Sequence, residues 1–388
     1  MTFPILIISY CFAWSSKDII DGLTHRYYGL YSNIARIVLR YGGATYWYGV
    51  RERKLLKIFN GKAYLSRHSM LTAVVKALKD AFTFGKPVIV ILDYPHSFLG
   101  VEYLITYLST LLMLHVFRLI GAVFVAVDNM DPPIEHAIEL KGKISLLERL
   151  LWLLLNGLIF RFNVIIFHSK SYKIYHKLYY KTSYDTAVVI PPGSFPGTIP
   201  YIEPMPEAHV NILSSGRIHE WIGLAKIIEL IKALKCKGIR IKFTVLDKSA
   251  PTSLKEEDIK VVNTYVNYFD FLKLLTESHI LLLIRPKSLH HTLTVRATIA
   301  DYMMAGRPII YLDSLGIREV VSRIRGCYSF KSLEEIPIIL QKLTGDTLSL
   351  SKLSRDIRSY AEKYLDYRKL ALNLLREVMK RIYNKKGV

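Results

Sequence analysis

The chain has 388 residues, of which 51% are hydrophobic and 22% are charged, a balance that excludes an intrinsically disordered protein. Because a single hydrophobic core stops growing at roughly 250–300 residues, this length predicts two domains. The formal net charge of +21 predicts an anionic partner, either an acidic membrane surface or a phosphate-bearing ligand. The sequence contains no RNA-binding motif and no zinc-finger spacing, so no nucleic acid is expected as a partner.

The cysteine and glutamine contents bear on the protein's environment. Cys11, Cys236 and Cys327 are odd in number and far apart, which favours a reducing cytoplasm over a disulfide framework. Gln341 is the only glutamine, and a scarcity of thermolabile amides is typical of thermophilic proteins. The sequence therefore predicts a cytoplasmic protein of a thermophile, with peripheral attachment to the inner face of the membrane as an option that its positive charge favours.

Apolar runs alternate with helical segments through the first half of the chain. The run over 5–10 lacks a basic flank and a small-residue cleavage site, so it is predicted to be a strand rather than a signal peptide. A helical segment follows over 21–42. Continuous apolar strands separated by helices predict a parallel sheet covered on both faces. The other runs predicted as strands of this sheet are 44–50, 88–94, 122–128, 164–169 and 187–193.

Two long apolar stretches have the length of membrane spans but are predicted to be buried α/β units. The first, 103–127, contains His115 and Arg118, and Gly121 divides it into a helix and a strand. The second, 146–167, is interrupted by charged residues and asparagines. A charge in the middle of a bilayer costs at least about 2.5–3.5 kcal/mol. Neither stretch is therefore expected to cross a membrane.

A proline-rich segment over 191–207 predicts an interdomain linker. After it the alternation of strands and helices restarts and continues through 208–350, and the tail over 351–388 is predicted as one or two helices. The sequence thus predicts an α/β fold with two doubly wound parallel sheets, one in an N-terminal domain over 1–190 and one in the C-terminal domain. Ligands of such sheets bind at the carboxyl ends of the strands.

The most informative segment runs from Thr294 to Glu319. Its apolar residues repeat at helical spacing, and Thr294 is predicted to cap the helix. Gly306 is predicted to end it, because glycine adopts the left-handed conformation that often follows a helix, and Pro308 prevents its continuation. A buried strand is then predicted over 309–312.

Arg296 and Asp301 lie on the first turns of this predicted helix, where free N–H groups and the helix dipole favour an anion such as a diphosphate. The segment resembles the donor-binding helix of GT-B glycosyltransferases, especially those of the retaining family 4, in which two glutamates precede the glycine. By this resemblance Asp301 occupies the position that holds the donor ribose, and Leu293 the position that contacts the donor sugar. The sugar contact could pass to a polar neighbour: His290, His291 or Thr292.

A second point of resemblance follows the run over 210–215. Gly216 and Arg217 match the Gly-Arg pair of family 4, and Gly223 matches a further glycine, but Ile222 stands where the family has a lysine. Glycine lets the backbone approach a diphosphate, and arginine offers its oxygens a bidentate fork. The resemblance implies that Gly216 and Asp301 bind the donor. Lys226, one helical turn further on, and Arg285 or Arg296 on the facing loop could compensate for the missing lysine. Thr294 and Arg296 are added as donor-binding candidates because they lie at the start of the predicted helix.

Candidate catalytic residues of the first domain lie where its strands end. His25 lies in the loop after the first strand and could orient an acceptor or contact a donor phosphate. Asp128 ends the run over 122–128, so we prefer it to Asp131 as the residue that faces the ligand. Together with Arg217, these are the predicted catalytic residues.

The resemblance implies a GT-B fold whose tail crosses back to the N-terminal domain, and a glycosyltransferase acting from a nucleotide-diphosphate sugar. It implies a retaining reaction without metal or other cofactor, in which the leaving phosphate accepts the proton of the acceptor hydroxyl. The acceptor is expected to be a glycan or a lipid-linked molecule. The sequence has no Asp-x-Asp, HExxH, CxxC or GxGxxG motif, which argues against metal-dependent, zinc-hydrolase and redox chemistry.

Leu293 departs from the family pattern, which keeps open a hydrolase and a nucleotide-sugar epimerase of GT-B shape. Leu293 and Ile222 together favour a further alternative, a non-catalytic GT-B scaffold.

Overall fold

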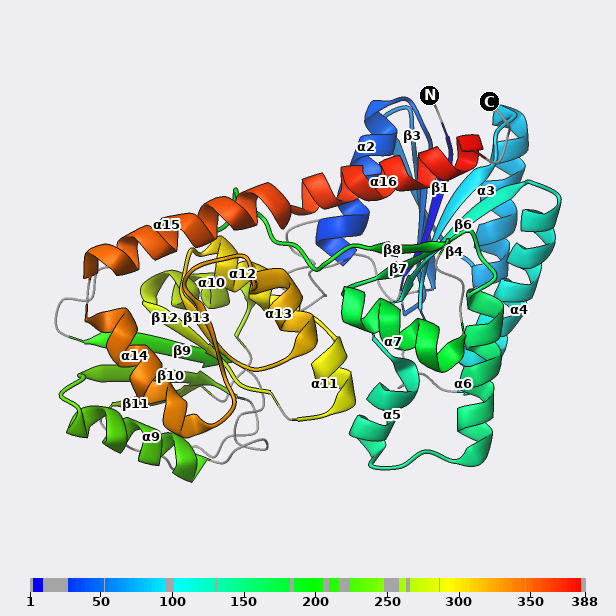
Figure 1. Ribbon diagram of the computed structural model, residues 1–388. Coiled ribbons are helices and arrows are strands. Elements are labelled where there is room, and N and C mark those ends of the chain that lie inside the picture. Colours follow the sequence, from blue (N-terminus) through cyan, green and yellow to red (C-terminus); the bar gives the residue numbers. More distant parts are fainter. Residues whose placement is uncertain are drawn as a thin grey trace. The chain divides into compact units, whose positions relative to one another are not determined.

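The computed structural model (Figure 1) divides into two compact units, one formed by Met1–Pro191 with Tyr367–Val388 and the other by Pro192–Asp366. Each unit is built on its own largely parallel sheet. The fold class predicted from the sequence, two Rossmann-like α/β sheets, is therefore confirmed. The structure describes residues 3–9, 27–51, 53–94, 101–129, 131–181, 185–204, 209–215, 224–247, 258–262, 266–285, 287–345 and 347–384.

The described part of the first unit contains an eight-stranded sheet in the order β4-β3-β2-β1-β5-β6-β7-β8. Strands β1, β5 and β6 are buried along their whole length, which explains why they are continuous apolar runs in the sequence. All pairs from β2 to β8 are parallel. The strands are β1 (Ile5–Ser9), β2 (Thr45–Gly49), β3 (Lys54–Phe59), β4 (Lys62–Arg67), β5 (Val88–Asp93), β6 (Val123–Asn129), β7 (Val164–Phe167) and β8 (Ala187–Val189).

The antiparallel pairs β2–β3 and β3–β4 at one edge of this sheet were not predicted from the sequence. Asn60 and Gly61 join β3 to β4, and both have positive φ angles, 48° and 73°. An Asn-Gly pair in this conformation is the preferred two-residue hairpin turn. The signal was therefore present, but β4 is exposed along its length and shows no apolar run.

Helices cover both faces of the first sheet. On one face α3, α4 and α6 lie side by side, and on the other α16 packs against α2 (Figure 1). Gly121, with a φ of 76°, separates α4 from β6 as predicted. The helices are the π-helix η1 (Tyr27–Tyr31), α2 (Ser32–Arg40), α3 (Met70–Phe84), α4 (Val101–Leu119), α5 (Pro133–Lys141), α6 (Leu146–Ile159), α7 (Lys170–Tyr180) and α16 (Tyr367–Asn384).

The second unit has a six-stranded sheet, parallel throughout its described strands, in the order β11-β10-β9-β12-β13-β14. Along the chain, β10 and β11 are added on one side of β9, and β12, β13 and β14 are then added on its other side. A doubly wound sheet binds ligands where this reversal occurs. The strands are β9 (Val210–Ser215), β10 (Ile241–Leu246), β11 (Ile259–Val262), β12 (Ile280–Leu283), β13 (Ile309–Leu312) and β14 (Cys327–Phe330).

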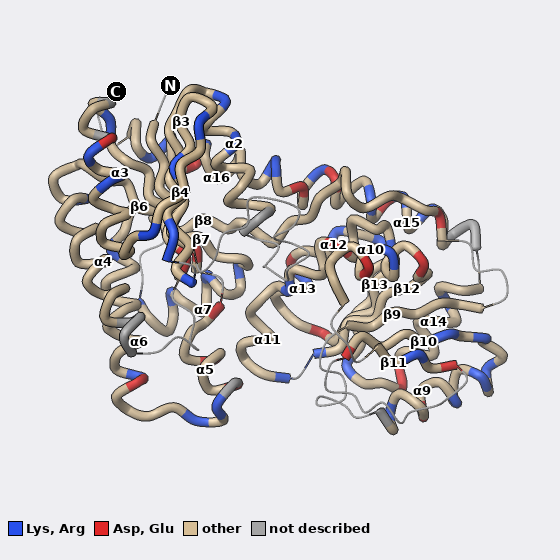
Figure 2. The backbone as a smooth tube through the Cα atoms, turned by 180° about the vertical axis from the view of Figure 1, so that it is seen from behind, with Lys and Arg blue, Asp and Glu red and all other residues tan. Residues whose placement is uncertain are grey.

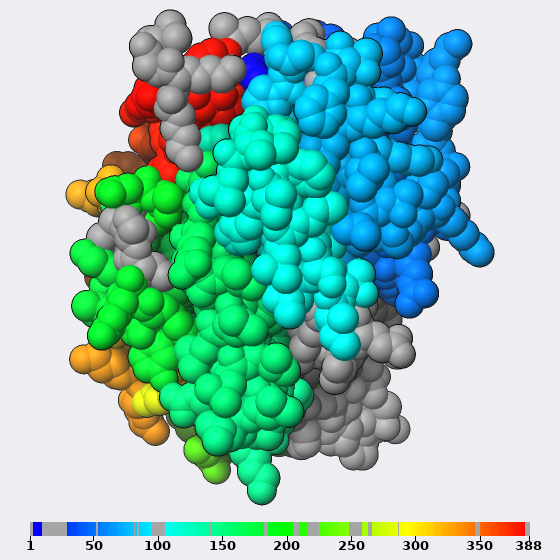
Figure 3. All heavy atoms as spheres, turned by 90° about the vertical axis from the view of Figure 1, so that its right-hand side faces the viewer, coloured from blue at the N-terminus to red at the C-terminus, as the bar shows by residue number. Residues whose placement is uncertain are grey.

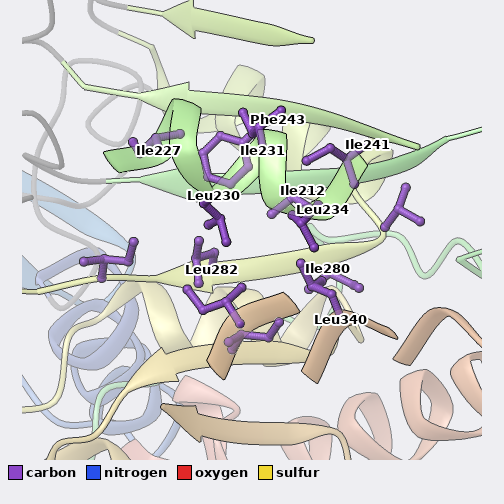
Figure 4. Close-up of a cluster of buried hydrophobic side chains, with 14 of the residues drawn as sticks. Ile212, Ile227, Leu230, Ile231, Leu234, Ile241, Phe243, Ile280, Leu282 and Leu340 are labelled. Carbon is purple, nitrogen blue, oxygen red and sulfur yellow. The ribbon is translucent and has the colours of Figure 1, made fainter. Parts of the chain in front are cut away.

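A buried aliphatic core fixes the second sheet to its helices. The side chains of Ile227, Leu230 and Leu234 project from α9 toward the sheet, where they meet Ile212 and Leu282 (Figure 4). Spacings of three and four residues place these α9 positions on one helix face. The helices of this unit are α9 (Leu224–Cys236), α10 (Tyr268–Glu277), α11 (Leu289–Leu293), α12 (Thr298–Met304), α13 (Leu315–Val321), the 3₁₀ helix η2 (Leu333–Glu335), α14 (Ile336–Thr344) and α15 (Thr347–Tyr364).

The described residues that follow Pro191 are held inside the second unit. The Arg358 guanidinium on α15 donates hydrogen bonds to the carbonyls of Pro196 and Ile199, at 2.9 and 2.8 Å. The backbone N–H of Ser194 donates to the carbonyl of Leu365 at 2.7 Å. The proline-rich segment is thus fixed to α15, and α16 follows as part of the first unit.

Among the described helices, none combines the length and the apolar character needed to cross a membrane.

Candidate functional site

Polar side chains gather at the carboxyl ends of neighbouring strands in the first unit. Asp128, fully buried near the end of β6, accepts a hydrogen bond from the Tyr31 hydroxyl at 2.7 Å. His168 directly follows β7, and its Nε2 lies 3.9 Å from the Asp128 carboxylate. Asp93, at the end of β5, pairs in register with Asp128. The structure therefore brings the predicted Asp128 together with a histidine and a second carboxylate.

His168 and Tyr31 are candidate site residues that the sequence analysis did not single out. His168 has the same relation to its strand as Asp128, because both follow an apolar run at the carboxyl edge. Strand-end position was thus a signal that could have found His168. Tyr31 lies 97 residues from Asp128 in the chain. Its approach depends on how η1 packs, and no local pattern reveals that.

At the reversal point of the second sheet, β9 is linked to the segment that precedes α12. The Arg296 guanidinium donates a hydrogen bond of 2.9 Å to the carbonyl of Ser215, the last residue of β9. The Ser215 hydroxyl lies 2.6 Å from the Tyr302 hydroxyl on α12. Burial lowers the pKa of Arg296 from its usual value and raises that of Tyr302. The segment of the first motif is therefore bonded to Ser215, the residue that directly precedes Gly216 in the sequence.

Thr294 does not cap the helix that contains Asp301, and that prediction is wrong. Thr294 is the C-cap residue of α11, with φ −94° and ψ 155°, and its hydroxyl donates to the His290 carbonyl at 2.9 Å. Its hydroxyl oxygen is thus bonded back to the preceding turn rather than to α12. Helix α12 begins at Thr298, and its N-cap, Ala297, makes no side-chain cap.

Arg296 consequently precedes α12 instead of lying on its first turn, whereas Asp301 is on the first turn as predicted. The N–H groups of Ile299 and Ala300 already donate to the carbonyls of Arg296 and Ala297, each at 3.1 Å. These amides are therefore less available to a diphosphate than the sequence suggested. Positive charge at this place comes from the Arg296 side chain.

The predicted end of the helix is confirmed. Gly306 has a φ of 69°, and β13 follows Pro308. A Cβ atom at Gly306 would lie 2.8 Å from the Tyr201 ring and 2.9 Å from the Ser354 carbonyl. Only glycine fits both the conformation and the space.

Asp301 is only 1% exposed. Its Oδ1 accepts hydrogen bonds from the Ser194 hydroxyl at 2.5 Å and from the Tyr268 hydroxyl at 3.1 Å. The carboxylate thus joins α12 to α10 and to the segment after Pro191. A contact between Asp301 and a donor ribose stays a prediction.

The other predicted donor-binding cations differ in their surroundings. Arg285, buried after β12, donates to the Thr294 carbonyl at 3.4 Å. Lys226 is exposed on the first turn of α9. Its charge contributes, after hydrogen bonds from Ser332 and the Glu334 backbone, to a lowered pKa of Glu334. Arg285 is thus bonded to the segment between α11 and α12, which also contains Arg296. Lys226, by contrast, lies near η2.

Helix α11, where His290 and His291 were considered for the sugar contact, is tightly packed. Both histidines are buried, and their ring centroids lie 4.8 Å apart. The Ser314 hydroxyl donates to the His291 carbonyl at 3.0 Å. A Cβ atom at Gly316 on α13 would lie 2.6 Å from the Thr294 carbonyl oxygen. The close approach of α13 therefore fixes the backbone that carries these histidines.

Three predicted site residues, His25, Gly216 and Arg217, lie outside the described residues, as do Ile222 and Gly223. Their roles stay predictions. The described residues on either side of the Gly216 loop are Ser215 and Leu224.

No family model matches the sequence, and no curated protein matches it. Solved structures match it along almost the whole chain. Sucrose-phosphate synthase from Thermosynechococcus elongatus has a TM-score of 0.65 at 10% identity, covering 99% of this chain and 100% of that one. The UDP-forming alpha,alpha-trehalose-phosphate synthase from Burkholderia vietnamiensis has a TM-score of 0.60 at 8% identity, covering 98% and 99%.

HepE from Anabaena, solved in complex with UDP, has a TM-score of 0.56 at 12% identity, covering 98% of this chain and 100% of that one. At these identities the likeness defines the fold. The chain has the two-domain GT-B fold of these enzymes. The assignment to family 4 goes further than this likeness and stays a prediction.

Proposed function

We propose that this protein is a glycosyltransferase that moves a sugar from a nucleotide-diphosphate donor to an acceptor hydroxyl. The observation that carries the proposal is the match of both units, over 98% of this chain, to a GT-B protein that was solved with UDP. Fold alone does not fix chemistry. The hydrogen bond from Arg296 to Ser215 adds a site-level argument, because Ser215 lies at the reversal point of the second sheet.

We assign the donor to the second unit. The loop with Gly216 and Arg217 directly follows β9, so the Arg217 guanidinium would pair with the diphosphate oxygens. Arg296 supplies a second positive charge beside the same strand end. Arg285 and Lys226 take the place of the lysine that Ile222 replaces. Preorganised cations of this kind stabilise the charge that grows on the leaving diphosphate, which is usually the largest catalytic contribution.

We assign the acceptor to the first unit, where Asp128, His168 and Asp93 are buried at the carboxyl edge of the sheet. Asp128 would orient the acceptor or stabilise positive charge at the reacting carbon. We propose a retaining, metal-independent reaction in which the leaving phosphate takes the proton from the attacking hydroxyl. A lipid-linked or cell-surface glycan is the acceptor class that best suits the net charge of +21.

The experiment that tests the proposal measures nucleotide-sugar binding and turnover with wild type and Arg217→Ala. The expected result is a loss of turnover of about 10²–10³-fold with the fold intact, in line with removal of one charge-stabilising donor. Arg240→Ala is the matched control, because Arg240 is exposed at the amino-terminal end of β10, on the opposite edge of the same sheet.

The alternatives give different results in the same experiment. Release of UDP with an altered sugar and no need for an acceptor would identify an epimerase. A protein whose melting temperature shifts with no nucleotide sugar of a broad panel would be a non-catalytic scaffold. Equal turnover by Arg217→Ala and Arg240→Ala would refute the donor site proposed here.

A further inference from the structure

Two helices of the first unit expose apolar side chains where a globular protein normally exposes polar ones. Along α4 the exposed positions recur at helical spacing and are mainly aliphatic. Leu119, at the end of this stripe, is 76% exposed, and Leu146 at the start of α6 is 74% exposed. The large aliphatic residues exposed on or directly after α4 and on α6 are Ile105, Leu112, Val116, Leu119, Ile120, Leu146, Leu147, Leu150, Leu151, Leu153 and Leu154.

These helices are firmly held on their inner sides, so the exposed stripe is a feature of a folded structure. Trp152 on α6 and Tyr107 on α4 are buried. His115 on α4 contacts the Leu158 carbonyl of α6 at 2.9 Å and stacks on Phe162 with ring centroids 4.1 Å apart. An apolar face of this extent marks an interaction surface.

A groove continues the apolar surface from α4 to α3. It has a volume of about 300 Å³ and lies where α3 and α4 end, lined by Phe82, Ile120 and Lys86 among others. Phe82 is exposed beside it. Most of its lining residues are apolar, and the one charged residue among them is Lys86, whose ammonium lies 5.3 Å from the Phe3 ring centroid. That combination suits an acyl chain whose headgroup carries a negative charge.

The surface beyond α3 changes from apolar to basic. The tube view shows Lys and Arg along β3 and β4, whereas α4 is almost free of charged positions (Figure 2). A recess of about 280 Å³ between the hairpin and α3 is lined by Lys57, Lys76 and Lys79. Asp80 in this recess is bonded to Lys57 and to the Tyr46 hydroxyl. Further cations of this region that are exposed are Arg51, Arg53, Lys62 and Arg67.

Figure 3 looks onto this side of the first unit, where the residues of the hairpin and α3 (blue), of α4 (cyan) and of α6 (teal) follow one another. We propose that this face, from β3–β4 across α3 and α4 to α6, docks the protein on an anionic lipid bilayer. The inference rests on the proposed function, because it supplies the surface that carries a lipid-linked acceptor. The apolar helices would lie in the headgroup region, and the basic hairpin would contact the phosphates.

A bilayer explains this surface better than a second copy of the chain. Protein interfaces are enriched in Tyr, Trp, Phe, Met and Arg, and Trp, Tyr and Arg supply most of their binding energy. The described exposed side chains of α4 and α6 are aliphatic or small, apart from Arg149 and Thr106. The flanking charges are nearly all positive, which complements anionic lipid and would repel a like surface.

Vesicle flotation tests the proposal with vesicles of phosphatidylcholine alone and with vesicles that contain phosphatidylglycerol. Wild type is expected to float with the anionic vesicles at low salt, and less at high salt. The variant Leu147→Gln/Leu150→Gln/Leu154→Gln is expected to lose at least about tenfold in vesicle affinity. The control Ile202→Gln/Ile338→Gln changes two exposed isoleucines of the second unit and should float like wild type.

The same samples are tested for nucleotide-sugar binding and for mass by light scattering. Wild type that stays unbound with anionic vesicles, or a leucine variant that floats equally well, overturns the docking face. Wild-type dimers that dissociate in the leucine variant would assign the face to self-association instead. A leucine variant that no longer floats but still binds a nucleotide sugar would show that the docking face acts separately from the donor site. Flotation without binding of any nucleotide sugar would refute the function and leave the docking face standing.

Discussion

The guanidinium of Arg296 donates a hydrogen bond of 2.9 Å to the backbone carbonyl of Ser215, although 81 residues separate the two. Ser215 ends β9 and immediately precedes Gly216. One contact therefore connects the segment before α12 with the loop that carries Arg217. In the proposed enzyme this contact would set the position of the loop and place a cation beside the diphosphate.

Replacing Arg296 should consequently affect both stability and donor binding. Arg296→Ala is expected to lower the free energy of unfolding by about 1–3 kcal/mol, because a partly buried carbonyl loses a charged donor, and to weaken nucleotide binding. Urea denaturation and calorimetric titration with a nucleotide sugar measure the two effects. Arg318→Ala is the control, since Arg318 is exposed and pairs with Asp313 on the same surface. This substitution should lower the free energy of unfolding by less than about 1 kcal/mol. Equal effects of the two substitutions would contradict the role given to Arg296.

Asp301 should be important for the stability of the second unit. Asp301→Ala removes the buried acceptor of the Ser194 and Tyr268 hydroxyls, so the free energy of unfolding is expected to fall by about 2–4 kcal/mol. Combining it with Ser194→Ala should cost less than the sum of the two single changes, because the substitutions remove the same hydrogen bond. Denaturation curves of the three variants measure this coupling.

Asp356→Ala, an exposed aspartate on α15, provides the control and should change stability little. The conservative Asp301→Asn separates the structural role from the predicted ribose contact. A variant of normal stability that no longer binds a nucleotide sugar would support the ribose contact. An Asp301→Ala protein as stable as wild type would show that the buried hydrogen bonds contribute little.

The parts of the structure that the sequence predicted correctly are those set by residues close together in the chain. The alternation of apolar strands and helices gave the two sheets, and Gly121, Gly306 and Pro308 marked element ends correctly, because these signals act within a few residues. Asp301 is different. Its partners lie 107 and 33 residues away, so the helix pattern could place Asp301 on the first turn without revealing that it is buried.

The error at Thr294 has a similar cause. A threonine before an apolar helix predicts an N-cap, but a hydroxyl can also bond to the carbonyl four residues earlier. Here Thr294 takes the second option with His290, in a backbone segment fixed by Gly316 on α13. Tertiary packing therefore decided between two local options. The hairpin at Asn60 and Gly61 was missed for another reason: its turn signal was sound, but β4 has no buried face.

His176 should make the protein less stable in acid. Its ring lies against Phe160 and Tyr180, with centroid distances of 3.9 and 4.4 Å, and burial lowers its pKa from 6.5 to about 3. Between these values the unfolded chain binds a proton that the folded chain does not. The stabilisation that the neutral His176 ring gives to the folded protein is therefore complete above about pH 6.5. As the pH falls below this value, the free energy of unfolding declines by up to about 1.4 kcal/mol per pH unit.

The variant His176→Phe keeps an aromatic ring in this position and has no proton to gain. Its free energy of unfolding should consequently fall less steeply than that of wild type between about pH 6.5 and pH 4. Urea denaturation at several pH values gives both curves. Parallel curves would mean that His176 is protonated in the folded protein or that its environment opens in acid.

Gly316 offers a test of the packing that holds the α11 segment. In Gly316→Ala the new Cβ atom would lie 2.6 Å from the Thr294 carbonyl oxygen and 2.9 Å from that of Leu293. Because these are backbone atoms, α13 or the segment must shift, at an expected cost of about 1–3 kcal/mol. The shift would also disturb the carbonyl that accepts from Arg285, so nucleotide binding should weaken along with stability.

Gly157→Ala is the matched control, because Gly157 lies in α6 and a Cβ atom there would meet nothing within 4 Å. That substitution should raise stability by up to about 1 kcal/mol through helix propensity and leave nucleotide binding unchanged. Thermal unfolding with and without a nucleotide sugar measures both quantities. If Gly316→Ala is destabilised but binds the nucleotide as wild type does, the α11 segment supports the fold without contributing to the donor site. The donor would then depend on the β9 loop and Arg296 alone.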